Sequence, residues 1–173
     1  MTIREVLLLG DPILRNICES VDDISTLNDL FDDLKDTLTR LQEDYGMGRG
    51  LAAPQIGYNK RIVYIQMPDR SFYLINPKIT SRSKETFDVW DSCFSMKASF
   101  FVKIPRNRQI RVEYLDRHGK EHAEYFHDGL SELLQHEIDH LDGILCSDHL
   151  RSPKDIVLFE EWEKRYKEKG IGM

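Results

Sequence analysis

The nine residues QHEIDHLDG (Gln135–Gly143) carry the strongest signal for the fold, because they place two histidines four positions apart with a glutamate between them. On an α-helix this spacing corresponds to about 40° of rotation and roughly 6 Å of rise, so both imidazoles project from one face. Two histidines placed in this way can bind one ion at Zn–N distances near ~2.1 Å. Glu137 lies about 100° around the axis, beside such an ion rather than among its ligands. The stretch therefore predicts a metal-binding helix.

An ordinary half-buried helix is the alternative interpretation of the same stretch. Leucines and one isoleucine form an apolar face on it, at Leu133, Leu134, Ile138 and Leu141. A half-buried helix does not ordinarily place His, Glu, Asp and His within one turn unless these groups have partners. The pattern therefore favours metal binding, and because ligating histidines must be neutral, we expect binding to weaken as the pH falls.

Two histidines leave a third protein ligand to be found, and the residues alone leave its identity open. Glu160 and Glu161 lie about as far downstream as the glutamate ligand of one class of HExxH peptidases. The third histidine of another class is missing, because the segment 142–144 reads DGI where that motif would continue. Cys93, within WDSCFSM, is the remaining candidate. Its alternative role is that of a small buried apolar residue, the commonest fate of a free cysteine.

Bulk properties limit the classes of protein that need to be considered. The length of 173 residues fits one domain over residues 1–173, large enough to bury a core. A net charge of −6 argues against direct nucleic-acid specificity, which needs a basic surface. No apolar run approaches the ~18 residues of a membrane span, and the cysteines (Cys18, Cys93 and Cys146) show no disulfide pattern. We therefore expect a cytoplasmic protein that does not contact membranes.

The periodicity of apolar residues predicts the order of the secondary structure. Helices are expected at Ile24–Tyr45, at about Leu130–Leu141, and at Ser152–Lys169 with Ser152 as its N-cap. Strands are expected at Arg61–Met67 and Ser71–Ile75, and a hairpin joins Gln109–Leu115 to Lys120–Phe126 through the turn DRHG. This order predicts an α+β fold in which antiparallel β-sheets pack around the central HExxH helix, with N-terminal and C-terminal helices.

Three motifs in a fixed order give the chain a resemblance to a known family. GRGLAAPQIG (Gly48–Gly57), a later cysteine loop and QHEIDHLDG resemble the peptide deformylases. The signatures of that family are Gly-x-Gly-x-Ala-Ala-Pro-Gln, Glu-Gly-Cys-x-Ser and Gln-His-Glu-x-Asp-His. The first and third are intact here, and GDPILR and INPKI also look like family features. The resemblance covers roughly Val6–Leu150.

The resemblance implies a metal site and a general base. It assigns the metal to Cys93, His136 and His140, which would hold one divalent ion. In this family the ion is Fe(II) in the cell and often Zn or Ni in purified protein. The resemblance also implies that Glu137 takes a proton from water and passes it to the leaving amine.

Three further positions receive a role only through the resemblance. Gln55 and the backbone N–H of Phe94 match the groups that stabilise the oxyanion in the family. Gly50 matches the position whose backbone lies against the substrate, where a side chain would obstruct it.

The implied function is hydrolysis of the N-formyl group from the N-terminal formyl-methionine of newly made polypeptides, with release of formate. The nascent peptide would lie extended along a strand edge. An apolar pocket near Leu133 and Phe94 would take the methionine side chain. The last helix, with its mixed charges, is a weak candidate for transient ribosome contact, and a solvated face is the alternative.

The middle signature departs from the family pattern and keeps other functions open. Asp91-Ser92-Cys93-Phe94-Ser95 replaces Glu-Gly-Cys-Leu-Ser, so Asp91 is one methylene shorter. Ser92 would cost about 1 kcal/mol if its position requires a positive φ. The usual Pro-Gly pair after the signature is missing, and Glu132 sits where many members carry Arg. These changes put substrate preference and rate in question.

Three alternatives to a formyl-methionine deformylase therefore stay open at this point. The first is an enzyme of the deformylase fold that acts on another N-formyl or N-acyl amine. The second is a zinc peptidase with Glu160 or Glu161 as its third ligand. The third is a metal-bound interaction protein near the ribosome, for which the motif residues Glu137 and Gln55 would have no use.

Overall fold

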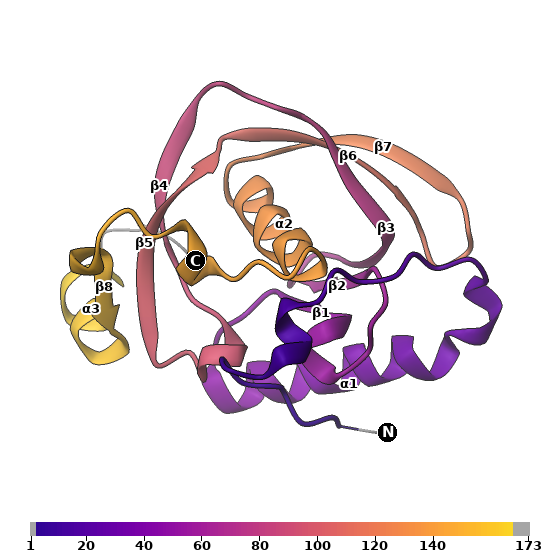
Figure 1. Cartoon of the computed structure of the whole chain (residues 1–173), viewed down its shortest axis with the longest axis horizontal. Coiled ribbons are helices and arrows are strands. Elements are labelled where there is room, and N and C mark those ends of the chain that lie inside the picture. Colours follow the sequence, from indigo (N-terminus) through magenta and orange to yellow (C-terminus); the bar gives the residue numbers. More distant parts are fainter. Residues whose placement is uncertain (1–2, 168–173) are drawn as a thin grey trace.

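The structure, a computed structural model, describes residues 3–167 and has the expected α+β architecture (Figure 1). Its α-helices are α1 (Asn28–Tyr45), α2 (Asp128–Leu141) and α3 (Phe159–Arg165). The strands are β1 (Gly50–Ala52), β2 (Ile62–Gln66), β3 (Ser71–Arg82), β4 (Thr86–Asp91), β5 (Phe100–Asn107), β6 (Gln109–Leu115), β7 (Glu121–His127) and β8 (Ile156–Leu158). Among the described helices, none combines the length and the apolar character needed to cross a membrane.

Helix α2 lies in the middle of the fold, with the two antiparallel sheets around it (Figure 1). One sheet has the strand order β1-β2-β3-β6-β7, and the other has the order β4-β5-β8. Leu134, Ile138 and Leu141 bury the apolar face of α2 in one cluster with residues of the five-stranded sheet. Each such side chain stabilises the fold by about 1.5–3 kcal/mol when fully buried. The apolar face thereby fixes the rotation of α2 and directs its histidines toward the second sheet.

Helix α1 covers strands of the five-stranded sheet with a second apolar cluster, which includes Leu34 and Leu38. The helix ends where predicted, because Gly46 adopts a left-handed conformation (φ 64°) as its C-cap. It begins later than the predicted Ile24. Asp23 instead caps a separate 3-10 turn, Ile24–Thr26, by accepting a hydrogen bond from the Ser25 N–H.

The predicted strands are present, although one is longer than the pattern indicated. Strand β3 continues past Ile75 to Arg82 and pairs with β6 from Ile75 onward, with an irregularity in the register between Ile75 and Lys78. Asn76 lies at this irregularity with φ 51°, and its side chain binds both backbone groups of Val21. The hairpin of β6 and β7 forms as predicted, with Gly119 at φ 79° in its turn.

The predicted C-terminal helix was wrong over its first half. Ser152 caps a 3-10 turn, Pro153–Asp155, and the chain then forms strand β8 instead of a continuous helix. Strand β8 pairs with β5, so hydrogen bonds to the sheet replace those of a helix over the run IVL, whose β-branched residues favour strands. Helix α3 begins only at Phe159, and residues 168–169 of the prediction lie outside the described residues.

Candidate metal centre and active site

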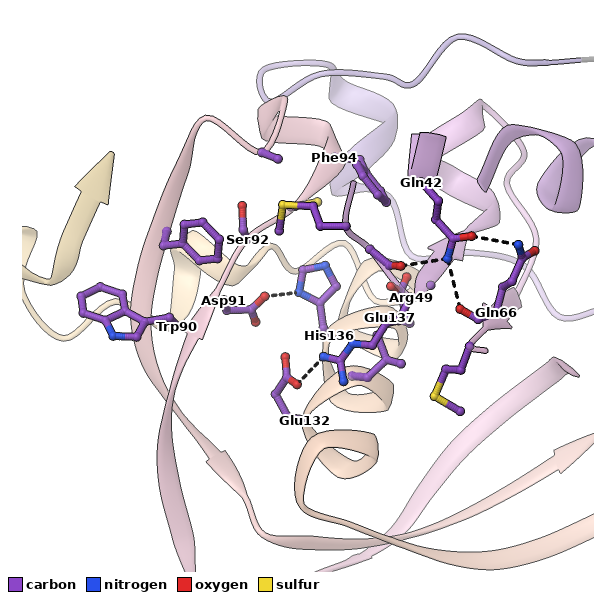
Figure 2. A pocket seen from close by; sticks show the side chains of 18 of the residues that line it. Gln42, Arg49, Gln66, Trp90, Asp91, Ser92, Phe94, Glu132, His136 and Glu137 are labelled. Carbon is purple, nitrogen blue, oxygen red and sulfur yellow. Dashed lines mark hydrogen bonds and ion pairs between the residues drawn. The ribbon is translucent and has the colours of Figure 1, made fainter. Parts of the chain in front are cut away.

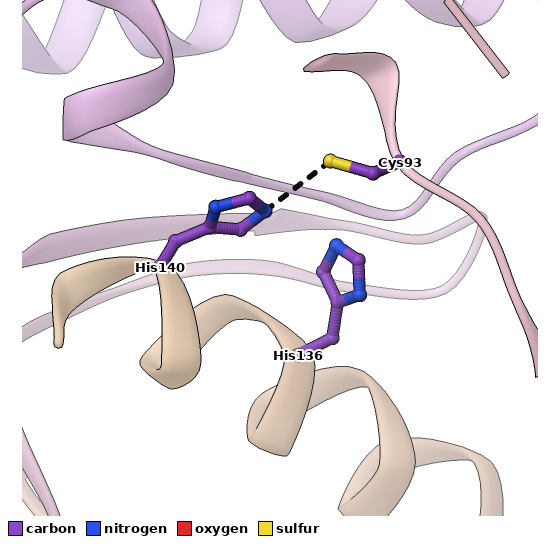
Figure 3. A group of neighbouring side chains, drawn as sticks. All are labelled: Cys93, His136 and His140. Carbon is purple, nitrogen blue, oxygen red and sulfur yellow. Dashed lines mark hydrogen bonds between the residues drawn. The ribbon is translucent and has the colours of Figure 1, made fainter. Parts of the chain in front are cut away.

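Cys93, His136 and His140, hereafter the ligand triad, come together although a long stretch of chain separates the cysteine from the histidines (Figure 3). Each offers one ligand atom, and these atoms lie within 4.8 Å of one another. The Cys93 Sγ is 3.3 Å from the His140 Nε2. All three side chains are buried, with exposed fractions of 4%, 7% and 1%. Both histidines project from α2, and the cysteine reaches them from the loop after β4.

A buried ion-pair network orients His136 from behind. Its Nδ1 lies 2.7 Å from an oxygen of Asp91, so the Nε2 is the nitrogen left for a ligand. The second Asp91 oxygen accepts a hydrogen bond from Arg106 at 2.9 Å, and Arg106 also donates to Asp139. Asp91 and Arg106 are each 3% exposed. Asp91 is shorter than the family's glutamate but still forms a salt bridge with Arg106. The same carboxylate also contacts His136, a candidate metal ligand.

The cysteine loop is held without strain at Ser92. Ser92 is not among the non-glycine residues with a positive φ. Its position therefore does not require a glycine, contrary to the possibility raised by the sequence. Its hydroxyl donates to the carbonyl of Phe100 at 2.9 Å. Left-handed conformations fall instead at Lys97 (φ 54°) and Ala98 (φ 46°), in the part of the loop that lacks the Pro-Gly pair. Ser92 therefore ties the loop to β5.

The surroundings of Cys93 favour its thiolate. Burial by itself would raise the pKa of the thiol, but the neighbouring His140 and His136 outweigh it and lower this pKa to about 5. A thiolate is the form in which cysteine binds metal.

Glu137 lies next to the ligand triad, on the cavity side of α2. Burial raises the pKa of its carboxyl group to about 7, against the opposing effect of His136 and His140. A carboxyl with a pKa near neutrality can both accept and release a proton. One of its oxygens is buried and has no partner among the described residues. A side chain at Gly50 would place its Cβ 2.5 Å from the other oxygen. Gly50 therefore leaves room for the carboxylate.

Gln55 and Phe94 border the same space. Gln55 is 2% exposed, and its amide nitrogen lies 3.3 Å from the Cys93 Sγ and 3.2 Å from the Ser95 hydroxyl. Its carbonyl accepts from the Ala52 N–H, which leaves the NH₂ group directed toward the triad. Phe94 is the first residue of the 3-10 turn Phe94–Met96, a position where helical N–H groups have no acceptor within the helix.

An open cavity of about 540 Å³ adjoins these groups (Figure 2). Cys93, His136 and Glu137 line it, as do Leu133 and Phe94. The expectation of an apolar pocket is incomplete, because an ion pair also lines the cavity.

The ion pair joins Arg49 to Glu132, with 2.8 Å between its nitrogen and oxygen. Burial, together with the nearby Asp91, raises the pKa of Glu132, and Arg49 opposes this shift. The structure thus shows Arg49 as the partner of Glu132, the residue that the sequence marked as unusual.

The glutamates considered as a third ligand lie elsewhere. Glu160 is exposed on α3, and Glu161 forms ion pairs with Lys164 and Arg165 on the same helix. Neither belongs to a metal-ligand group among the residues that the structure describes.

Sequence reasoning missed the supporting residues Arg106 and Ser95 and the pocket residue Arg49. Arg106 lies in a β-strand and Ser95 near the cysteine, where no spacing rule identifies a partner. Only the position of Arg49 between two motif glycines could have drawn attention to it.

The residues fit a divalent ion. One thiolate and two imidazoles are donors that suit zinc and iron, and a carboxylate orients one imidazole as is common in metal sites. With Glu137 beside three protein ligands, fold and site define a metal-dependent hydrolase of the HExxH type.

Comparison with known proteins identifies the family. The sequence model described as polypeptide deformylase matches residues 3–155. Peptide deformylase 2 of Clostridium perfringens is 35% identical over 159 residues, which cover 91% of this chain and 99% of that protein. A solved peptide deformylase from Legionella pneumophila superposes with a TM-score of 0.80 at 34% identity, over 89% of both chains. A peptide deformylase from Synechococcus elongatus, solved in complex with actinonin, gives a TM-score of 0.81 at 28% identity over 93% of this chain and 85% of that one. The chain belongs to the peptide deformylase family.

Proposed function

We propose that the ligand triad and Glu137 form the catalytic centre with which this chain removes the N-formyl group from formyl-methionyl peptides. The chain is an enzyme of the peptide deformylase family, a family of metal-dependent hydrolases that act on nascent peptides. The observation that carries the proposal is the convergence of one sulfur and two ring nitrogens beside a buried carboxylate.

Different groups of the protein transfer the proton and stabilise the negative charge in this reaction. A divalent ion held by the triad would lower the pKa of water and polarise the formyl carbonyl. Glu137 accepts a proton from the attacking water and delivers it to the amine nitrogen as the C–N bond breaks, so that formate and a free amine result. The amide of Gln55 and the N–H of Phe94 donate hydrogen bonds to the carbonyl oxygen as negative charge develops there.

The edge of the five-stranded sheet is the proposed binding surface for the peptide backbone. Strand β1 is the terminal strand of that sheet, and its first residue, Gly50, lines the cavity. An extended peptide can hydrogen-bond to such an edge irrespective of its side chains. This mode would place the formyl group near the triad and would tolerate many sequences beyond the first residue.

We propose Fe(II) as the ion in the cell, with Zn or Ni as its replacement in purified protein. The mixed sulfur and nitrogen ligand set supports this range of ions. A cytoplasmic location and transient ribosome contact stay predictions. The charges on α3 pair with each other, as Lys164 and Arg165 do with Glu161, which favours a solvated face over docking.

Formate release from formyl-Met-Ala-Ser by protein loaded anaerobically with Fe(II) tests the function. We expect turnover that is lost in the metal-free protein and restored by Fe(II). The matched acetyl-Met-Ala-Ser should stay intact. Turnover of the acetyl peptide would favour a broader amidohydrolase, and cleavage at an internal peptide bond would indicate a peptidase. A filled metal site with no turnover would refute the proposal.

A further inference from the structure

Helix α3 packs behind one wall of the cavity (Figure 1). Trp90 and Phe101 line the cavity and belong to the paired strands β4 and β5. The same two side chains form one buried cluster with Trp162 of α3. The residues of α3, all of them described, do not themselves line the cavity. The helix is therefore connected to the substrate space only through the aromatic side chains of the wall.

The stack of Trp162 on Phe101 is the tightest contact of this cluster. The ring centroids are 4.1 Å apart, and the ring planes differ by 11°. Trp162 and Phe101 are 2% and 1% exposed, so water reaches neither ring. In a close-packed interior, loss of one ring leaves a void into which the other can move. The position of Phe101 in the cavity wall therefore depends on Trp162.

Tyr166, directly after α3, makes a second contact of the same kind, with Trp90. Their ring centroids are 4.8 Å apart, and the planes differ by 36°. Met47, which precedes β1 and lines the cavity, also packs against the cluster. Because β1 and β4 are the terminal strands of the two sheets, the cluster connects both strand edges that border the cavity. The C-terminal segment thus helps to set the distance between these edges.

The backbone of the C-terminal segment is attached at the same place. Strand β8 pairs with β5, and Val157 lies opposite Phe101 in the register. The N–H of Phe159, the first residue of α3, donates to the carbonyl of Ser99 at 3.0 Å. Phe101 is therefore held twice by this segment, through the backbone of β8 and through the ring of Trp162.

A purely structural role is the alternative for Trp162, because a large buried aromatic side chain stabilises any fold. The two roles differ in what a substitution changes. A loss of stability alone reduces the amount of folded protein and leaves the KM of that protein unchanged. A displaced cavity wall weakens substrate binding and raises KM. The stacking partner of Trp162 lines the cavity, which favours the second role.

We propose that Trp162 is a positioning residue for substrate binding, which by stacking on Phe101 holds the aromatic wall of the cavity in place for the formyl peptide. The proposal rests on the proposed function, because the peptide concerned is the formyl-methionyl substrate. Trp162 lies outside the ligand triad and acts through Phe101. It therefore affects KM and leaves proton transfer unchanged.

Steady-state kinetics of formate release from formyl-Met-Ala-Ser by the Fe(II) protein tests the proposal. Trp162→Leu removes the ring and keeps an apolar side chain, so KM should rise roughly threefold to tenfold, the range that corresponds to one aromatic pair. Metal occupancy and kcat should stay within about twofold of the unaltered protein. Trp162→Phe retains a ring that can stack, and its KM should be within about twofold of the original.

Phe31→Leu is the matched control. Phe31 is 2% exposed, as Trp162 is, and packs on the ring of Tyr73 with 4.8 Å between the centroids. It does not line the cavity. This variant should lose stability and keep its KM. If Trp162→Leu does not fold, Tyr166→Leu replaces it, because Tyr166 is only partly buried and contacts the cavity wall at Trp90. Its KM should rise as well.

Fluorescence measures peptide binding without turnover. The chain has two tryptophans, so Trp162→Phe leaves Trp90 in the cavity wall as the only one. Titration of the metal-free Trp162→Phe protein with formyl-Met-Ala-Ser should change the emission of Trp90. Addition of Tyr166→Leu to this variant should shift the titration to higher peptide concentrations.

These measurements separate the positioning role from the proposed function. An unchanged KM in Trp162→Leu, or in Tyr166→Leu where the first does not fold, would overturn the positioning role and leave the proposed function intact. An equal rise of KM in Phe31→Leu would do the same. If no formate is released although Trp90 reports binding that Tyr166→Leu weakens, the proposed function fails and the positioning role stands. Absence of both formate and an emission change would overturn both.

Discussion

The two ends of the cavity are held in different ways. At the metal end, the triad and Glu137 are almost fully buried, and ion pairs that are themselves buried support His136. At the other end, Arg49 and Glu132 form an ion pair that is in partial contact with solvent. A buried network that loses one member leaves an uncompensated charge, whereas a partly exposed pair can exchange its partner for water. Changes at the metal end should therefore abolish the chemistry, while changes at the Arg49–Glu132 pair should have a smaller effect.

The largest expected effect follows from removing the sulfur of the metal end. Cys93→Ser should abolish metal binding, because two imidazoles alone hold an ion poorly and serine offers no thiolate. Metal stoichiometry by atomic emission, together with formate release, measures the result. Cys18→Ser is the matched control, since Cys18 is equally buried but lies in the apolar core. It should keep one metal per chain. Full metal occupancy in Cys93→Ser would remove this cysteine from the site.

The second-largest effect is expected at Glu137, where a substitution separates proton transfer from metal binding. Glu137→Gln keeps the shape of the side chain but cannot accept a proton. We expect full metal occupancy and a loss of ~100-fold or more in kcat. Glu160→Gln, on exposed α3, is the control and should leave the rate unchanged. A kcat near that of the unaltered protein would exclude Glu137 as the general base.

The support behind His136 gives an intermediate effect. Arg106→Met leaves the carboxylates of Asp91 and Asp139 without their shared cation. Loss of one partner in a buried ion pair costs about 3–5 kcal/mol of unfolding free energy. Weaker orientation of the ligand should lower metal affinity by about 10–100-fold.

Urea unfolding and competition with a chelator measure these two quantities. Arg108→Met, at an arginine whose side chain is 42% exposed, should change neither appreciably. If Arg106→Met does not fold, Arg106→Lys tests the same network, because lysine retains the charge but lacks the forked geometry. Unchanged affinity in both variants would show that the metal end does not depend on this network.

The smallest effect concerns Ser92 in the wall of the cavity. Because its backbone is not in the left-handed region, restoring the glycine of the family pattern should bring no relief of strain. Ser92→Gly should instead lower the unfolding free energy by about 1 kcal/mol, through loss of the hydrogen bond to Phe100. Thermal unfolding measures the change, with Ser92→Ala as the variant that loses only the hydroxyl. A gain in stability on Ser92→Gly would contradict the observed conformation.

The fold was predictable where a pattern reports a local property. The apolar periods of α1 and α2 and the turn of the β6–β7 hairpin each depend on neighbours a few residues away. The C-terminal segment failed for the opposite reason. Pairing of Ile156, Val157 and Leu158 with β5 decides their conformation, and this partner lies more than fifty residues earlier in the chain.

The residues of the candidate site were likewise predictable only where their relative positions depend on local structure. His136, Glu137 and His140 share one helix, so their relative positions follow from helix geometry alone. Cys93 and Gln55 lie far from that helix in sequence. The residues alone left Cys93 as one of several candidate ligands, and only the resemblance to a family assigned a role to Gln55 and singled out Cys93. The partners Arg106 and Arg49 were beyond both kinds of inference, because neither spacing nor motif names the group that each would contact.

The sequence by itself determined the central helix, the face that carries its histidines and the residue types suited to a metal. The tertiary structure alone decided which thiol meets those histidines, which arginine stabilises Asp91, and that Arg49 pairs with Glu132 in the cavity. The physical reason is the separation along the chain over which each interaction acts. Backbone dihedrals and side-chain direction repeat over a few residues and leave a periodic trace in the sequence, whereas a contact between distant segments depends on how two packed surfaces meet.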